Sequence, residues 1–463
     1  MEERNKPMLK RILHGNLVIK TRGSHQGYIL MNLRSFRREA ISVEQFNLLC
    51  QVKENQDSGH CPNKSAQRLY DTLLEKKQIL TEEQCRQYDE ARLVDYKNSV
   101  ENFAPIINLV TISPTFSCNF NCSYCYQREY KDKTYHMTRA DIDQICEFIN
   151  FINGTQHASQ GVKAVSLNGG ECCQPQNVDV INYILDIFST NSSCAFSLYT
   201  NGSKINLLKD KIDFSRFYSV QVSLDGYEEL FPLINGVSSK VFHSVISGIK
   251  LLAEKCKSVQ IACMLTPLVI EHMDEFVEVL KNNGILDYPN ISVGFSVISN
   301  FKKETIDRRF LSLEEYIQVR KQFQAAQYPK NVHIDPLREV RQITRHLLRE
   351  KARSVEREHA CNTEDARSAM FAPGGKVYWC LCSNQESEEI GFYTHPTLEA
   401  KDKYMQYLYR SPNNMDGCKN CDLKYVCRGG CPIFATAQGK KPSEGYCGLY
   451  ADSYFWDNLE ELL

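Results

Sequence analysis

The sequence has no surplus of either charge, since 55 Lys and Arg stand against 56 Asp and Glu and the formal net charge is −1. Proteins that bind nucleic acid usually carry a basic surface, so this balance argues against a nucleic-acid partner. The sequence also lacks a run of roughly 20 apolar residues that could span a membrane. The first twenty residues are charged throughout and contain no signal-peptide core. We therefore expect a cytoplasmic protein with no membrane partner.

Cysteine, by contrast, is abundant, with 20 residues in a chain of 463. In a reducing compartment these thiols do not form a disulfide framework, so they are metal ligands, free thiols or catalytic groups. The hydrophobic content of 42% and the charged content of 24% are those of an ordinary globular protein. The length predicts two to four domains.

Three cysteines with the spacing Cys118-x3-Cys122-x2-Cys125 directly follow an apolar run at Ile106–Phe116. Thiolates are the usual ligands of iron–sulfur clusters, and three of them leave one iron of a four-iron cluster open. The alternative is a zinc knuckle, but no second CxxC pair follows at the spacing that zinc sites show. With Tyr124 before the last cysteine, the motif resembles the radical S-adenosylmethionine (SAM) superfamily, in which the open iron binds SAM.

Short β-rich runs alternate with amphipathic helices from about residue 106 to 299, which is the pattern of parallel βα units. Strands are expected at 106–116, 162–168, 195–200, 219–224, 259–265 and 291–297, and helices at 138–151, 178–188, 241–255 and 271–281. Six units are too few for a closed eight-stranded barrel and suit the partial (β/α)6 barrel of radical SAM enzymes. We therefore predict an α/β fold whose chemistry lies at the carboxyl ends of the strands.

The resemblance also implies a set of SAM-binding residues at these strand ends: Tyr124, Gly169, Gly170, Glu171, Ser223 and Asp225. Tyr124 would neighbour the adenine, and Glu171, in a Gly-Gly-Glu motif, would meet the methionine ammonium. Ser223 and Asp225 match the positions of carboxylate and ribose contacts. Cys172 and Cys173 follow the motif where the family usually has proline. No catalytic side chain is identified from the sequence.

A second cysteine array lies near the C-terminus, with Gly375-x4-Cys380 before it and the run Cys418-x2-Cys421-x5-Cys427-x3-Cys431 followed by Cys447. It resembles the SPASM domain appended to many radical SAM enzymes that modify peptides. The resemblance implies one auxiliary four-iron cluster on Cys418, Cys421, Cys427 and Cys447, and another on Cys361, Cys380 and Cys431. The second cluster either has an open iron or takes Cys382 as a further ligand. The alternative is a zinc ribbon. With the first motif, the array predicts three [4Fe-4S] clusters and SAM as cofactors.

The expected domains are 1–90, a barrel at 105–335, a bridging helix at 336–360 and an iron–sulfur domain at 361–463. Within the first, a strand at 28–32 and helices at 42–52 and 66–77 flank a polar loop at 56–64. This unit loosely resembles the winged-helix domain that captures leader peptides in ribosomal-peptide maturases. The alternative is a structural cap on the barrel.

Three hypotheses about function follow. The first is a maturase that cleaves SAM to a deoxyadenosyl radical and installs a thioether or carbon–carbon crosslink in a ribosomally made precursor. Its partners would be a peptide with an N-terminal leader and an electron donor such as flavodoxin or ferredoxin. The second is a sulfatase-type maturase that forms formylglycine; such enzymes carry an aspartate where this chain has Leu381. The third is a non-enzymatic iron–sulfur or zinc scaffold.

Overall fold

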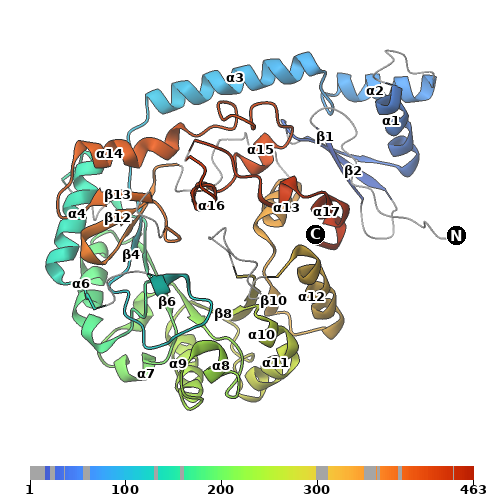
Figure 1. The fold of residues 1–463 in the computed structure, drawn as a ribbon. Coiled ribbons are helices and arrows are strands. Elements are labelled where there is room, and N and C mark those ends of the chain that lie inside the picture. Colours follow the sequence, from blue (N-terminus) through green and yellow to red (C-terminus); the bar gives the residue numbers. More distant parts are fainter. Residues whose placement is uncertain are drawn as a thin grey trace.

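The structure is a computed structural model in which residues 16–20, 27–35, 37–55, 63–129, 134–156, 161–298, 311–348, 361, 365–383, 388–441 and 443–462 are described (Figure 1). Its centre is a ten-stranded sheet with helices packed on one face. The strands run in the spatial order β10 (Val332–Ile334), β9 (Ile291–Ser296), β8 (Ser258–Met264), β7 (Ser219–Ser223), β6 (Ala195–Thr200), β5 (Ala164–Leu167), β4 (Leu109–Ile112), β11 (Ser368–Phe371), β12 (Lys376–Tyr378) and β13 (Glu389–Phe392).

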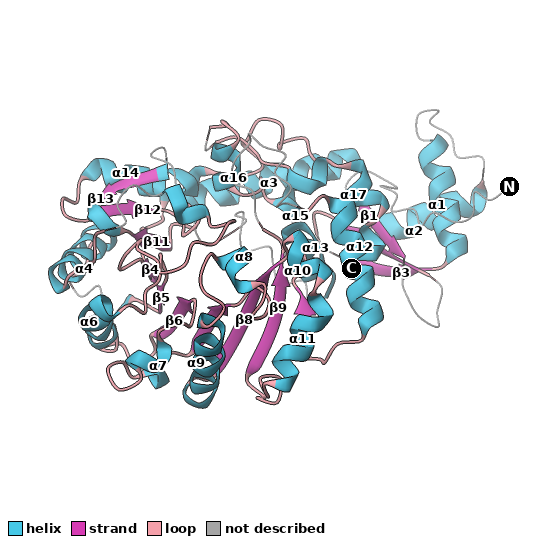
Figure 2. Cartoon of the chain, turned by 60° about the horizontal axis from the view of Figure 1, so that its bottom comes forward, coloured by secondary structure: helices cyan, strands magenta, loops and turns pink. Residues whose placement is uncertain are grey.

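The strands from β4 to β10 are parallel and follow one another in sequence order, as βα units require. Beyond β4 the sheet continues into β11, which is parallel, and then into β12 and β13, which are antiparallel. The sheet therefore extends past the expected barrel range of 105–335. Figure 2 shows β8 and β9 side by side, with α9, α10 and α11 around them.

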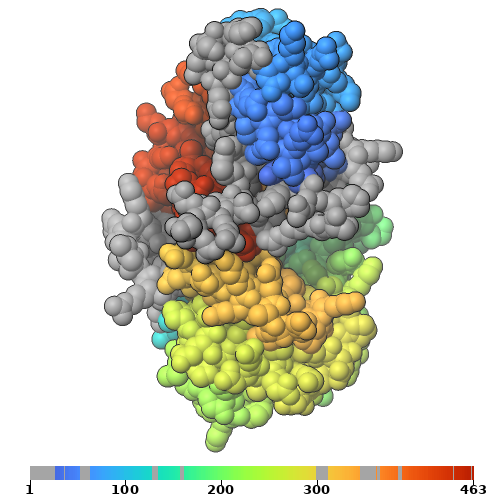
Figure 3. Space-filling view, turned by 90° about the vertical axis from the view of Figure 1, so that its right-hand side faces the viewer, coloured from blue at the N-terminus to red at the C-terminus, as the bar shows by residue number. Residues whose placement is uncertain are grey.

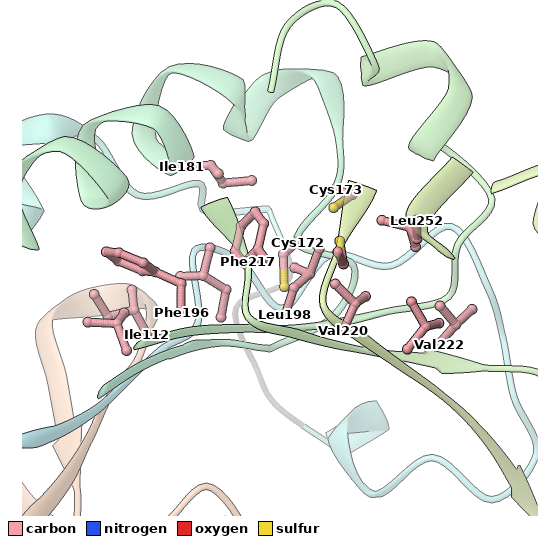
Figure 4. Close-up of a cluster of buried hydrophobic side chains, with 14 of the residues drawn as sticks. Ile112, Cys172, Cys173, Ile181, Phe196, Leu198, Phe217, Val220, Val222 and Leu252 are labelled. Atoms are coloured by element: carbon pink, nitrogen blue, oxygen red, sulfur yellow. The ribbon is translucent and has the colours of Figure 1, made fainter. Parts of the chain in front are cut away.

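The connections between these strands are helical: α4 (Arg139–Asn153), α6 (Val178–Phe188), α7 (Ile205–Leu208), α8 (Phe231–Asn235), α9 (Val241–Lys255), α10 (Pro267–Glu271), α11 (Met273–Asn282) and α12 (Leu313–Ala326). Helix α4 begins with a reciprocal capping box between Thr138 and Asp141. Alternate strand residues point toward these helices and form the core, as Figure 4 shows for Phe196, Leu198 and Val220.

The N-terminal unit is a small antiparallel sheet with two helices on it. The sheet has the order β1 (Asn16–Lys20), β2 (Tyr28–Asn32) and β3 (Arg38–Ile41), and the helices are α1 (Val43–Asn55) and α2 (Lys64–Glu75). Tyr28 stacks on Phe46 with ring centroids 4.1 Å apart. Most of the expected loop at 56–64 lies outside the described residues. A 20-residue helix, α3 (Glu82–Glu101), then runs toward the barrel, so the expected boundary at residue 90 falls inside it.

The C-terminal region consists mainly of short helices: α13 (Arg338–Leu348), α14 (Leu398–Met405), α15 (Lys424–Cys427), α16 (Pro432–Ala437), α17 (Ser453–Asp457) and α18 (Leu459–Leu462). The part of the expected bridging helix after residue 348 lies outside the described residues. Met31 and Leu33 of the N-terminal unit share an apolar cluster with Tyr425 and Phe455. Figure 3 shows the two regions next to each other at one end of the molecule. Of the helices described, none has the length and apolarity needed to cross a membrane.

Candidate functional site

The loop that carries the first three cysteines leaves the carboxyl end of β4 and is held against the Gly-Gly-Glu turn. The Gly170 N–H donates to Thr115 O at 2.9 Å, and the Glu171 N–H donates to Ser117 O at 2.8 Å. A Cβ on Gly170 would lie 2.1 Å from Ser117 O, and one on Gly169, whose φ is +123°, would lie 2.5 Å from Thr115 O. The sequence suggested that these glycines admit a ligand. In the structure, the absence of side chains at these two glycines lets the backbone of the cysteine loop approach closely.

Two of the three thiols of this loop accept hydrogen bonds from N–H groups. The Phe120 N–H donates to Cys118 Sγ at 3.4 Å, and the Asn235 side-chain amide donates to Cys122 Sγ at 3.3 Å. The Asn201 amide lies 4.0 Å from Cys118 Sγ. Burial raises the pKa of Cys118 to about 11 and that of Cys122 to about 12. Both thiols are therefore protonated near neutral pH unless a metal takes the place of the proton.

Glu171 is completely buried at the end of β5 and ties this strand to the next one. Its carboxylate accepts hydrogen bonds from Thr200 Oγ1 at 2.6 Å, the Asn201 N–H at 2.6 Å and the Cys173 N–H at 2.8 Å. Burial raises its pKa even though these three donors oppose the shift. Its charge acts on Cys118, so the two predicted site residues are neighbours.

Asp225, also completely buried, fastens the cysteine loop to the ends of β7 and β8. It accepts hydrogen bonds from the Tyr124 hydroxyl, from Asn235 Nδ2 at 3.0 Å and from the Met264 N–H at 2.7 Å. Because Asn235 also donates to Cys122, one buried amide connects this carboxylate with a cysteine thiol. The structure thus brings Tyr124, Asp225 and the cysteine loop together.

Ser223 ends β7 and lies on the face of the sheet that the helices leave uncovered. Ser219, Gln221 and Ser223 alternate with the buried Val220 and Val222, which face the helices. Hydroxyl-bearing residues from five neighbouring strands stand in register on this face: Thr111, Ser166, Ser197, Ser219 and Ser258. This face is therefore polar and suits a hydrogen-bonding ligand better than an apolar one.

Some of the C-terminal cysteines influence one another electrostatically. Burial raises the pKa of Cys427 to about 12, and the charges of Cys421, Cys418 and Cys447 add to this shift. These four thiols are therefore within electrostatic reach of one another. In the same way, the charge of Cys380 acts on Cys431. Cys361 is exposed, and most of the residues around it lie outside the described part of the chain.

Tyr126 connects the two cysteine regions. Its hydroxyl donates to the Leu381 carbonyl at 3.2 Å, across 255 positions of sequence. Its pKa is raised first by burial and then by the charges of Cys382, Cys125 and Cys380. The segment around Leu381 therefore lies beside the first cysteine loop, on the same side of the barrel.

Cys172 and Cys173, which replace the usual proline, lie in the apolar core and not in the site. They are 0% and 1% exposed, and Figure 4 shows them among core side chains. Within the described residues, no three His, Cys, Asp or Glu side chains converge closely enough to hold a single metal ion. Neither Asn235 nor Tyr126 stood out in the sequence, because each acts on a partner far away along the chain.

The site combines a mostly parallel α/β sheet with three thiols on the loop after the first strand of the barrel. Residues 112–281 match the family model described as the Radical SAM superfamily. This part of the chain is therefore a radical SAM domain. The match includes the cysteine loop, the Gly-Gly-Glu turn and Asp225.

Comparisons with individual proteins agree with this assignment. Streptococcus suis SuiB bound to precursor peptide SuiA has a TM-score of 0.53 at 16% identity, covering 90% of this chain and 95% of that one. Native anSMEcpe with bound AdoMet and Cp18Cys peptide has a TM-score of 0.54 at 17% identity, covering 77% and 98%. GTP 3',8-cyclase of Clostridium perfringens is 26% identical over 211 residues, which are 45% of this chain and 55% of that protein. The chain thus spans about half the length of the curated relatives it matches, and the two solved structures establish a shared fold.

The donor set fits an iron–sulfur cluster. The residues present are three thiols on one short loop, two of them raised in pKa by burial and each approached by an N–H group. Hydrogen bonds to the sulfurs are one of the means by which proteins stabilise such clusters. Cys118, Cys122 and Cys125 are the residues that would hold it.

Proposed function

We propose that this protein is a radical SAM maturase that forms a thioether or carbon–carbon crosslink in a ribosomally synthesised precursor peptide. The observation that carries the proposal is the contact between Tyr126 and Leu381, which sets the C-terminal cysteine segment beside the first cysteine loop. The likeness to SuiB, solved with a precursor peptide, extends over nearly the whole chain and supports it. A second neighbour was also solved with a bound peptide.

Cys118, Cys122 and Cys125 would hold the first cluster, and SAM bound beside it would supply the radical chemistry that removes a hydrogen atom from the substrate. The chain's own residues hold and orient these groups. Glu171 and Asp225 each accept three protein hydrogen bonds, and a carboxylate offers about four acceptor sites. Because both are completely buried, their role in this structure is to fix the strand ends and the cysteine loop around the SAM site. Ser223 and the hydroxyl-lined face would bind the remaining polar groups.

The C-terminal thiols would hold two auxiliary clusters, which makes three [4Fe-4S] clusters in all. One would take the group of four centred on Cys427, and the other would take Cys380 and Cys431 together with Cys361. The backbone N–H of Cys382 lies 3.5 Å from Cys380 Sγ, so Cys382 remains a candidate for a further ligand. An electron donor such as flavodoxin or ferredoxin would reduce these centres in the cytoplasm.

The N-terminal unit would bind the leader of the precursor. Its three-stranded sheet has β1 and β3 as outer strands, and an extended peptide can add to such an edge through main-chain hydrogen bonds. The unit is also packed on the C-terminal region through Met31 and Leu33. A docked leader would thus be tethered close to the second cysteine segment, raising the effective concentration of the core peptide near the barrel.

The test uses the reconstituted protein with SAM, a strong reductant and candidate precursors, namely short peptides encoded beside its gene. A crosslink removes two hydrogen atoms from the peptide and leaves no aldehyde, and mass spectrometry would detect it. An aldehyde captured by hydroxylamine would instead identify a formylglycine-forming enzyme, a reaction that Leu381 in place of aspartate disfavours. GTP is tested in parallel because of the cyclase similarity. Turnover of GTP, with every peptide left unmodified, would refute the proposal.

A further inference from the structure

A cavity of about 370 Å³ lies where the N-terminal unit, α3 and the C-terminal region meet. Its walls include Arg34 from the turn after β2, Asp89 from α3, and Lys419, Asp422 and Lys424 from the segment around Cys421. The volume is in the range of ligand cavities, about 300–1,000 Å³. It is separate from the barrel site described above, which lies at the ends of β4 to β8.

Hydrogen bonds to the backbone N–H and to the backbone carbonyl of Arg34 fix the position of this residue. Asn32 Oδ1 accepts hydrogen bonds from the N–H groups of Arg34 and Ser35, both at 2.9 Å, and this shapes the turn. The Tyr88 hydroxyl donates to Arg34 O at 2.8 Å. The side chain of Arg34 is only 9% exposed. Its direction is therefore fixed by the fold before any ligand arrives.

The guanidinium uses only part of its donor capacity. Nε and Nη2 donate to the two oxygens of Asp89, at 3.2 and 3.3 Å. Nη1 is buried without a hydrogen-bond partner among the described residues, and the carboxylate of Asp422 stands 3.9 Å from it. A buried charged donor that makes no hydrogen bond is costly. This atom is therefore poised to take an acceptor from a ligand.

The Nη1 donor of Arg34 matches a carboxylate oxygen, because hydrogen bonds between a guanidinium and a carboxylate are among the strong ones. Lys424, whose side chain is 2% exposed, is 2.8 Å from Asp89, so Arg34 and Lys424 share this carboxylate, and Asp422 is a second carboxylate beside Arg34. At the rim, the cations Arg86 and Lys419 are balanced by Glu82 and Glu90. Selectivity therefore comes from the inner end of the cavity and not from the net charge of its mouth.

We propose that this cavity binds the carboxylate of an aspartate or glutamate side chain of a peptide, with Arg34 Nη1 as the donor. The choice of a peptide rests on the proposed function, since the cavity lies between the unit expected to bind the leader and the segment that carries Cys421. The prediction that the cavity binds a carboxylate does not depend on the proposed function. A free carboxylic acid is the other possible source, and the test separates the two.

The probe is the capped tripeptide Ac-Ala-Glu-Ala-NH2, with Ac-Ala-Gln-Ala-NH2 as its neutral partner, titrated against the full chain by ligand-observed NMR. We expect the acidic peptide to bind and the neutral one to bind about tenfold more weakly, as for loss of one charged hydrogen bond. Acetate binding as tightly as the acidic peptide would assign the site to free acids and would overturn the peptide part of the proposal.

Two substitutions with opposite effects separate a binding role from a structural one. Arg34→Gln should weaken binding of the acidic peptide about tenfold, whereas Asp422→Asn should tighten it by removing the competing carboxylate. Arg139→Gln breaks an exposed ion pair with Asp179 on the outside of the barrel and serves as the control. Equal binding of both peptides, or weaker binding by Asp422→Asn, would overturn the carboxylate site. Neither outcome depends on SAM or on turnover of a precursor, so failure here leaves the proposed maturase activity standing.

Discussion

The packing of the Gly-Gly-Glu turn against the cysteine loop makes Gly170→Ala an informative substitution. The added Cβ would lie 2.1 Å from Ser117 O and 2.6 Å from the carbonyl carbon and oxygen of Phe116. A carbon–oxygen contact normally has a length of about 3.3 Å or more, so the two segments must separate by about 1.2 Å. Backbone atoms cannot rotate away as a side chain can, and overpacking of this kind typically costs about 1–3 kcal/mol of stability.

The displaced backbone lies directly before Cys118, so the same substitution should also lower the rate of SAM cleavage. A shift of about 1 Å at a reacting centre can cost about 100-fold in rate. We therefore expect Gly170→Ala to lower the free energy of unfolding by about 1–3 kcal/mol, measured by denaturant titration. We also expect deoxyadenosine formation from SAM to fall by about two orders of magnitude with a strong reductant in excess.

Gly161→Ala is the matched control, because nothing lies within 4 Å of its added Cβ and its φ is not positive. It should change the free energy of unfolding by no more than about 0.5–1 kcal/mol. If Gly170→Ala were as stable as this control and cleaved SAM within about twofold of the natural protein, the steric reasoning would be wrong. The glycine would then serve some other purpose in the turn.

Three further predictions concern the cluster sites. Replacing Cys118, Cys122 and Cys125 together by Ala should abolish deoxyadenosine formation while the C-terminal centres survive, as iron analysis and absorption spectra would report. Anaerobic reconstitution should yield three four-iron clusters, and stoichiometric zinc with a single four-iron cluster would contradict the C-terminal assignment. Asn235→Ala should destabilise the protein by about 1–3 kcal/mol through loss of buried hydrogen bonds, and Asn235→Asp by more, because it sets a second carboxylate beside Asp225. Equal unfolding midpoints for the two variants would count against this reading.

Much of the barrel could be predicted because its elements have strong local patterns. The bounds expected for β6, α6 and α9 agree with the structure residue for residue. The α3 helix has no comparable pattern, since Cys85 and Tyr96 are its only fully buried side chains among twenty. Strand β11 is only four residues long and pairs with β4 across most of the chain. Such a pairing leaves no local signal in the sequence.

The candidate site was predictable in its residue types but not in its supporting contacts. The cysteine spacings predicted two regions of cluster ligands, since ligand spacing is a property of the sequence alone, and this assignment stays a prediction. Asn235 and Tyr126 could not be found in this way, because their partners Cys122 and Leu381 are more than 100 positions distant. Gly169 and Gly170 were predicted to lie in the site. The fold shows that glycine is needed there because the backbone of the cysteine loop passes within contact distance of both residues.

The buried carboxylates give the cysteine loop a fixed position before any cofactor binds. Glu171 holds the end of β6 through Thr200 and Asn201, and Asp225 holds the loop itself through Tyr124 and Asn235. Both have a raised pKa because burial disfavours their charge, and the donors around them partly offset this cost. A buried acid with nearly all of its acceptor sites in use cannot reorient freely. The cysteine loop is therefore already shaped before a cofactor arrives, and little ordering cost remains for binding.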